Sequence, residues 1–311
     1  MSLKASTSPN VAHTALDFVF YQKFNDYANS KEVGLASSDD DLVFKQATAD
    51  GDKVIYDEFS GTGYLQERTN EEAEIAAYSP RVTNNVSLAI KEFAQAVDVP
   101  RNFMMDEKHG VVKANVEAMA RSLRMTQDNY NLDRWALGFT TVVTNDAVAA
   151  FSNSHTAIDG TTIDNLENGL MTAANLEILI VSLGRQKDQS GKLGYHHAKI
   201  LLVPQNLLKE GCEMIDSELL PGTGNNNINW ISRKYPGLIV KYSPFLDDTS
   251  TTAYFLAGGD HSFKRYVREA VNTNYIPWNI SKNRVGSYQI AFREVTNPIS
   301  FAGLAASNGT V

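Results

Sequence analysis

The chain has 311 residues, of which 43% are apolar and 21% charged, and its formal net charge is −8. This length and composition predict a soluble globular protein of about two folding units and exclude a generic disordered chain. The acidic balance argues against a surface that binds nucleic acid tightly. The single cysteine excludes an intrachain disulfide and a Cys-rich zinc site. The lack of a long apolar run argues against a membrane helix.

The first hundred residues predict a peripheral arm followed by a hairpin. Residues 14–28 carry apolar side chains at helical spacing, which predicts an amphipathic helix that docks on another surface. Residues 53–59 are rich in β-formers and 60–63 form a turn, so a β-hairpin is expected. The polar segment 63–80 shows no core face, and a hairpin without a core does not persist alone. The alternation in residues 86–99 predicts a strand that helps to carry this hairpin.

The clearest helix prediction covers residues 106–138. Asp106 and Glu107 are favourable at a helix N-terminus, and Gly138 is a plausible C-terminal stop. Apolar residues follow at spacings of four, three and four, namely Val112, Val116, Met119 and Leu123. At 1.5 Å per residue a single helix here would span roughly 45–50 Å, which is typical of a strut rather than of an ordinary globular helix.

Residues 139–265 predict an α/β region. In 165–188 we expect a helix broken around Met171, with Thr172 capping its second part. Residues 198–204 form a continuous apolar run, typical of a strand that is covered on both faces. The remaining expected elements are a helix between Pro204 and Pro221, strands at 237–245 and 251–259, and extended segments at 263–273 and 287–303.

The segment FSNSHTAIDGTTIDN (151–165) places Ser154, His155 and Asp159 close together in sequence, and these are the side-chain types of a serine hydrolase. Side chains of consecutive residues do not face each other on a helix or a strand. A catalytic serine also needs a sharp turn, and the chain contains no Gly-x-Ser-x-Gly. We therefore reject a catalytic triad and expect no catalytic residue.

Other side chains give no recognisable chemical site. The histidines have no metal-ligand spacing, so we interpret them as polar loop residues. The glycine-rich segments 61–66 and 222–227 lack the third glycine of a dinucleotide-binding loop. The acidic run 67–74 is interpreted as a surface for basic residues of a neighbour rather than as a cation site. We expect neither a metal nor a cofactor.

The order of the expected elements resembles that of the major capsid proteins of tailed bacteriophages, whose fold is shared by encapsulins and by the floor of herpesvirus capsids. MARSLRMTQDNYNLDRWALGF (119–139) is similar to the end of that family's spine helix, and AAFSNSHTAIDGTTIDN (149–165) is similar to its Phe-Ser-x-x-His loop. Residues 171–207 resemble its helix, Lys-Asp-x-x-Gly turn and LLVP strand, and residues 283–303 resemble its closing strand. The likeness covers roughly residues 12–305.

The resemblance implies an α+β tailed-phage major capsid fold with four parts. These are an N-terminal arm (1–45), an extended β-hairpin loop (46–82), a peripheral domain (83–140 and 267–311) with a spine helix (106–138), and an α/β axial domain (141–266). It also implies that the chain is not an enzyme. Copies would assemble in the host bacterial cytoplasm, as pentamers and hexamers, into the icosahedral head of a virion that encloses double-stranded DNA.

Two sets of residues gain roles from the resemblance. A structural loop at the base of the axial domain would include Phe151, His155, Gly160 and Asn165. Contacts between subunits would include Phe20, Phe24, Tyr64, Glu67, Arg68, Glu71, Glu72 and Glu74. No lysine lies between Lys53 and Lys91, so we expect no covalent cross-link through the hairpin.

The expected partners also follow from the resemblance. Because only about 45 residues precede the hairpin, we expect a separate scaffolding protein rather than a fused one. A portal, packaged DNA held without sequence-specific binding, and decoration proteins complete the expected partners, and no membrane is among them. Two alternatives stay open: an encapsulin-like compartment with a protein cargo docked near the helix at 14–28, and a soluble α/β enzyme with a pocket of convergent polar groups.

Overall fold

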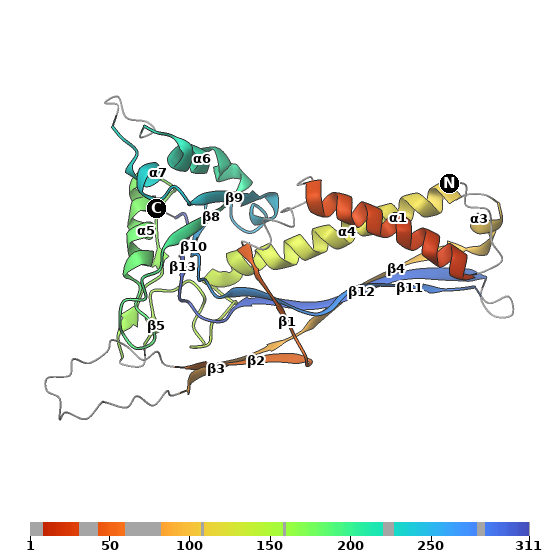
Figure 1. Cartoon of the computed structure of the whole chain (residues 1–311), viewed down its shortest axis with the longest axis horizontal. Coiled ribbons are helices and arrows are strands. Elements are labelled where there is room, and N and C mark those ends of the chain that lie inside the picture. The colour runs from red at the N-terminus through yellow and green to blue at the C-terminus, as the bar shows by residue number, and fades with distance from the viewer. Residues whose placement is uncertain are drawn as a thin grey trace, which may run out of the picture.

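The computed structural model divides into a long, narrow layer and a shorter α/β unit at one end of it (Figure 1). The long layer consists of a four-stranded sheet with helices α1 and α4, and the α/β unit consists of a five-stranded sheet with helices α5, α6 and α7. The structure describes residues 9–30, 43–59, 82–106, 109–157, 160–219, 227–278 and 284–310. None of the helices in these ranges is long and apolar enough to cross a membrane.

The sheet of the long layer combines segments from distant parts of the sequence. Its strand order is β1 (Lys45–Thr48), β11 (Phe263–Ile276), β12 (Val285–Pro298) and β4 (Lys91–Pro100). β1 pairs with β11 in parallel, whereas the other two pairings are antiparallel. Burial alternates along β12, so one face of this sheet is covered and the other is more open.

Two helices, α1 (Pro9–Ser30) and α4 (His109–Ala136), cover the same face of this sheet (Figure 1). Their shared core with the sheet contains Leu16, Phe20, Val99, Val112, Val116, Met119, Leu123, Tyr275, Tyr288, Ile290 and Phe292. The hydroxyl of Tyr288 donates to Asp17 of α1 at 2.7 Å. Burial and this bond to Asp17 raise the pKa of Tyr288. The helix expected at 14–28 is confirmed, and the surface on which it docks is its own chain.

A long helix occupies most of the span expected at 106–138, with α4 continuing into the 3-10 helix η1 (Leu137–Phe139). Its expected start is wrong, because α4 begins at His109 and Asp106 is the C-cap of the short preceding helix, residues 101–105. Gly138 lies inside η1 and is not the left-handed stop that the sequence suggested. Its role is steric, because a Cβ at this position would come within 2.6 Å of the Phe151 ring. The glycine therefore permits the close approach of the following loop.

A buried polar stripe interrupts the apolar face of α4, and the sequence analysis did not identify it. Its members recur at helical spacing on the side that faces the sheet, namely Arg124, Gln127, Asp128 and Asn131. Arg124 and Asp128 form an ion pair at 3.0 Å. Thr296 of β12 donates to Asn131 at 2.6 Å. These partnered groups fix how α4 sits on the sheet, since a buried polar group without a partner is costly.

The α/β unit has a sheet that is covered on both faces. Its strand order is β7 (Leu166–Glu167), β13 (Leu304–Ser307), β10 (Tyr254–Gly258), β8 (Ala198–Pro204) and β9 (Ile239–Ser243). One face packs against α5 (Ala173–Arg185), α6 (Leu208–Asp216) and α7 (Trp230–Lys234). The other face packs against the C-terminal end of α4 and the loop that follows it. The strand expected at 198–204 is confirmed residue for residue.

Two expectations for this unit need correction. The first half of the helix expected at 165–188 is wrong, because Leu166 and Glu167 form β7 beside β13. The cap is confirmed, since the Thr172 hydroxyl accepts from the Asn175 backbone N–H at 3.2 Å. Strand β13 pairs with β10, so residues 304–307 belong to the α/β unit and not to the peripheral domain expected to run to residue 311.

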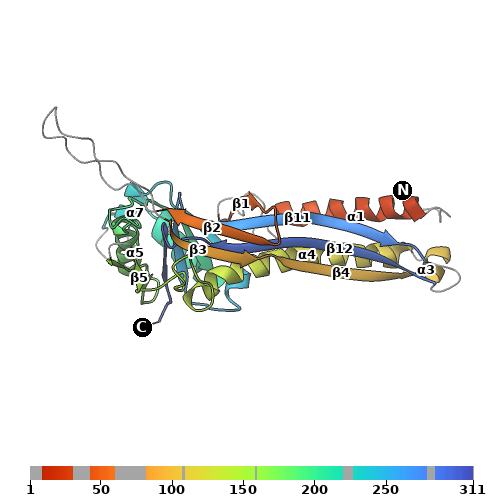
Figure 2. The same cartoon turned by 90° about the horizontal axis from the view of Figure 1, so that it is seen from below.

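The hairpin consists of β2 (Lys53–Phe59) and β3 (Val82–Ala89), with residues 60–81 outside the described part of the chain. It lies on the face of the long sheet that is opposite to α1 and α4 (Figures 1 and 2). Its base packs in a small core with Ala49, Val86, Tyr266, Val295 and Ile299. The extended loop expected at 46–82 therefore has shifted bounds: β1 belongs to the long sheet, and the hairpin continues to residue 89.

Short elements complete the described chain. They are α3 (Arg101–Met105), β5 (His155–Thr156), β6 (Thr162–Ile163), and the 3-10 helices η2 (Gln205–Leu207) and η3 (Pro244–Leu246). The helix expected between Pro204 and Pro221 is confirmed as η2 followed by α6.

Candidate functional site

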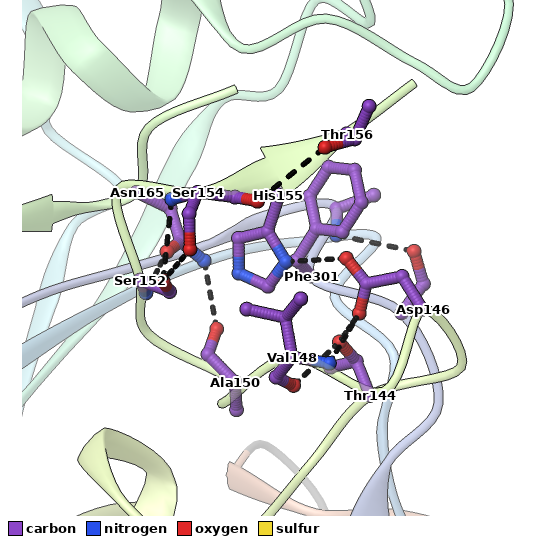
Figure 3. Close-up of polar contacts among 12 residues, drawn as sticks. Thr144, Asp146, Val148, Ala150, Ser152, Ser154, His155, Thr156, Asn165 and Phe301 are labelled. Carbon is purple, nitrogen blue, oxygen red and sulfur yellow. Dashed lines mark hydrogen bonds and ion pairs between the residues drawn. The ribbon is translucent and has the colours of Figure 1, made fainter. Parts of the chain in front are cut away.

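The loop between η1 and β7 joins the long layer to the α/β unit, and it contains all four residues predicted to be structural. Figure 3 shows two of them, His155 and Asn165. Within it, β5 and β6 form a two-stranded hairpin. Gly160 turns this hairpin with a φ of +80°, a left-handed conformation that favours glycine. Its N–H donates to the Ala157 carbonyl at 2.9 Å. A Cβ at Gly160 would meet no neighbour, so backbone conformation, not space, requires the glycine.

Phe151 holds the start of the loop in the core. The side chain is buried, and its ring lies 5.3 Å from the ring of Phe139, 5.4 Å from that of Phe255 and 6.1 Å from that of Trp135. The Phe151 backbone N–H donates to the carbonyl of Gly138 at 3.0 Å. The helix end and the loop are therefore joined by both packing and a backbone hydrogen bond.

Asn165 holds the end of the loop against its beginning. Its side-chain oxygen accepts from the Ser152 backbone N–H at 2.8 Å, and its side-chain nitrogen donates to the Ala150 carbonyl at 2.8 Å. Its own carbonyl accepts from the N–H of Ala306 in β13 at 3.0 Å. The buried side-chain amide of Asn165 thus satisfies two backbone groups of the loop, and its backbone carbonyl connects the loop to the α/β sheet.

His155 pairs with Asp146, a residue that the sequence analysis did not single out (Figure 3). The ring is fully buried and stacks on Phe301 with centroids 4.4 Å apart. Nδ1 donates to Oδ2 of Asp146 at 2.7 Å, while Oδ1 of Asp146 accepts from the hydroxyl of Thr144. Burial raises the pKa of Asp146, but the hydrogen bonds from His155 and Thr144 and the charge of His155 outweigh it and hold the pKa below its usual value.

The arrangement does not support nucleophilic catalysis. The hydroxyl of Ser154 shares a hydrogen bond of 2.8 Å with that of Ser152, while the ring of His155 is turned to Asp146. Asp159 lies outside the described residues. A triad needs the histidine between the serine and the acid, and the described residues of this loop do not have that arrangement. The signal that could have revealed Asp146 is its place in a tight Thr-x-Asp-x-Val turn just before the loop.

Two other histidines, His196 and His197, also have local partners. His196 lies 2.7 Å from a carboxylate oxygen of Asp260, and His197 stacks on Tyr235 with centroids 4.9 Å apart. Within the described ranges, no three His, Cys, Asp or Glu side chains are grouped closely enough to hold a metal ion.

The residues expected to contact neighbouring subunits lie in two places. Phe20 is 0% exposed and packs inside the long layer, so the expectation that it contacts another subunit is wrong for this conformation. Phe24 is half-buried and stacks on Phe20 with centroids 6.1 Å apart. The hairpin residues fall outside the described part of the chain, namely Tyr64, Glu67, Arg68, Glu71, Glu72 and Glu74.

Comparison with a family of known proteins matches the central part of this architecture. Residues 80–169 match the family described as the Mu-like prophage major head subunit gpT. The matched range contains β3, β4, the whole of α4 and the loop with Phe151, His155 and Asn165. Comparison with curated protein sequences returned no match.

Solved structures share the fold of most of the chain. The procapsid of bacteriophage JBD30 matches 98% of this chain and 77% of its own, with a TM-score of 0.52 and 11% identity. Mycobacterium phage Adephagia matches 86% of this chain and 87% of its own, with a TM-score of 0.51 and 13% identity. A virus-like particle from Pyrococcus furiosus matches 95% of this chain and 99% of its own, with a TM-score of 0.52 and 9% identity. The chain therefore has the fold of tailed-phage major capsid proteins.

Proposed function

We propose that this chain, which has the tailed-phage capsid fold, is the major structural subunit of a phage head and resides in the virion. Copies join as pentamers and hexamers, which close into an icosahedral shell around double-stranded DNA. The observation that carries the proposal is the match of residues 80–169 to a major head subunit family. That range contains both the longest helix of the chain and the loop that holds it to the α/β unit.

The shape of the subunit supports a role in a shell. Within the part of the chain that the structure describes, the long layer has helices on one face of its sheet and the narrow hairpin on the other (Figures 1 and 2). The described part of the hairpin exposes apolar side chains, including Ile55 and Val82. Such surfaces gain stability when another copy covers them. We assign the hairpin to contact with the adjacent subunit, the long layer to the shell wall, and the α/β unit to the ring axes.

The proposed partners follow the same reasoning. The similar JBD30 structure is a procapsid, which favours assembly through an immature shell and hence a scaffolding protein and a portal. The net charge of −8 favours DNA that is enclosed without tight binding, because a grip on phosphates requires clustered basic residues. Decoration proteins would bind the outside of the completed shell. The major head family suggests a structural protein rather than an enzyme.

A protein-filled compartment is the second candidate. The virus-like particle from Pyrococcus furiosus shares the fold as well as the phage structures do, with a TM-score of 0.52. The fold alone therefore does not separate a phage head from another closed shell. The family match of residues 80–169 favours the phage head.

Electron microscopy of the purified full chain tests the proposal. We expect closed icosahedral particles when the chain is produced with its scaffolding partner, and ring-shaped capsomers or particles when it is produced alone. Size-exclusion chromatography gives the mass in parallel. A stable monomer under both conditions would contradict a shell function. Nuclease-protected DNA in particles from infected or induced cells supports the phage head, whereas a bound enzyme would support the compartment.

A further inference from the structure

Helix α5 of the α/β unit carries apolar side chains on the side that faces away from its sheet as well as on the side that packs on it. Its inner side chains pack on the five-stranded sheet, namely Leu176, Leu179, Ile180 and Leu183. On its outer side Ile178 is 51% exposed and Val181 is also exposed. Glu177 and Arg185 are exposed beside them, so this side is mixed, with an uncovered apolar part between charges. Adjoining exposed apolar side chains mark a surface for association. The outer face of α5 therefore lacks a cover in the isolated subunit.

A groove runs beside this outer face. It has a volume of about 650 Å³ and lies between α5 and the segment that contains β6 and β7. Ile163, Ile178 and Val181 line it, and Glu167 places it at the β7 edge of the five-stranded sheet. Asp164, Glu167 and Glu177 contribute carboxylates to its lining, while Arg185 and Lys187 lie in it as the basic residues.

The opposite edge of the same sheet presents a second uncovered surface. Strand β9 is outermost in the strand order, and among the described strands it pairs only with β8. Ile239 is 41% exposed and Tyr242 is 39% exposed on this strand. Arg233 and Lys234, in the last turn of α7, are exposed just before it. A strand edge with exposed apolar side chains is a ready surface for association.

We propose that the α5 groove of one copy receives the β9 edge of the next copy, so that the α/β units join head to tail around a ring. The two surfaces lie at opposite edges of one sheet, and two different surfaces on opposite sides are what head-to-tail closure into a ring requires. The carboxylates Asp164 and Glu177 face the basic pair Arg233 and Lys234 across this contact. The inference rests on the proposed shell function and names the contact that builds its rings.

Cross-linking of cysteine variants tests which surfaces meet. The only cysteine is Cys212, so Cys212→Ser gives a clean background. With a short bismaleimide linker, the double variant Ile178→Cys, Tyr242→Cys should give a ladder of bands up to five or six subunits on a denaturing gel. Each single variant should stay monomeric, and an equal mixture of the two singles, assembled together, should give dimers. Dimers from Ile178→Cys alone would indicate a like-to-like contact and overturn the proposal.

Charge reversal tests the complementarity independently. Glu177→Lys or Lys234→Glu alone should weaken each contact by about two- to fivefold, as exposed ion pairs do, and the loss is repeated at every contact of a ring. The yield of shells should therefore fall well below that of the parent, and the double reversal should restore it. Lys209→Glu, on the exposed side of α6 in the same α/β unit, lines neither surface, so it is the matched control and should leave the yield unchanged.

The outcomes separate this inference from the proposed function. If the parent chain forms shells while the double-cysteine variant shows no ladder, or while both single reversals assemble normally, the inference is wrong and the shell function stands. Capture of a different protein at the groove in place of a second copy would also overturn it. If the parent forms no shell or capsomer under any condition, the proposed function itself fails.

Discussion

The two layers of this chain differ in how completely they cover themselves. In the α/β unit, β10 and β13 are buried along their full length, and β8 has a single exposed residue. In the long layer, β4 is exposed at six of its ten residues. The α/β unit completes its core within one copy and leaves contact surface at the β9 edge and on the outer side of α5, whereas the long layer exposes most of strand β4. A single chain thus combines a unit whose core is complete with a layer whose sheet remains partly uncovered.

The largest expected effect lies where the two layers meet. Trp135, at the end of α4, is buried and stacks on Phe263 with centroids 4.2 Å apart. Trp135→Ala should lower the free energy of unfolding by about 3–5 kcal/mol, because it leaves a large cavity that both layers line. Urea unfolding of the subunit measures this loss. The matched control is Trp230→Ala on α7, which is half-buried and should cost clearly less; equal costs would contradict the assigned junction.

A somewhat smaller effect is expected in the long layer, and it tests the position of the arm. Phe20 is buried between α1 and its own sheet, so Phe20→Ala should destabilise the isolated subunit by about 3 kcal/mol or slightly less, because α1 can detach locally. The amide hydrogen-exchange rates of residues in α1 should rise in the same variant. Phe18→Ala is the control, since Phe18 is 69% exposed on the same helix. Unchanged stability of Phe20→Ala would mean that α1 binds only to a neighbour.

The loop between the layers should show a pH-dependent effect. Asp146→Asn should cost about 1–3 kcal/mol near pH 7, because it replaces a charge-assisted bond to buried His155. The folded pKa of Asp146 lies below its usual value, so its contribution is present above about pH 4 and is lost as the pH falls through the folded pKa. Melting temperatures of parent and variant should therefore differ most at pH 6–7 and converge below pH 4. A constant difference across this range would contradict the pairing.

The smallest expected effect concerns the hairpin, which should form no covalent bond to a neighbouring subunit. The sequence has no lysine between Lys53 and Lys91, so assembled shells should dissociate to single chains on a denaturing gel. Mass spectrometry of digested shells provides the direct check. An isopeptide at Lys53 would show that the contact surface of the long layer is secured covalently.

Regular elements with local signals could be predicted from the sequence. Four of the predicted features depend only on residues that are neighbours in sequence. They are the apolar run of β8, the β-forming residues of β2, the Thr172 cap and the apolar periodicity of α4. The loop residues Phe151, Gly160 and Asn165 could be named as structural from their resemblance to a family loop. Their hydrogen bonds and packing are consistent with that assignment.

Features that depend on distant pairing could not be predicted. The place of β13 beside β10 follows from the tertiary fold, and four residues give no local sign of it. The polar stripe of Arg124 to Asn131 reads as a solvated helix face until Thr296 and the sheet are brought against it. Phe20 looks like a contact for a partner until the fold shows that the partner is its own chain.

The closing segment of the chain has a consequence for the order of folding. Residues 263–307 run without a break in sequence through β11, β12 and β13, and so supply strands to both sheets. β4 and β12 can pair only after a long intervening loop closes, which slows folding. Neither sheet is complete until this segment has paired with its neighbouring strands. The two layers should therefore complete their folding together and late, which delays the moment at which a newly made copy can join its neighbours.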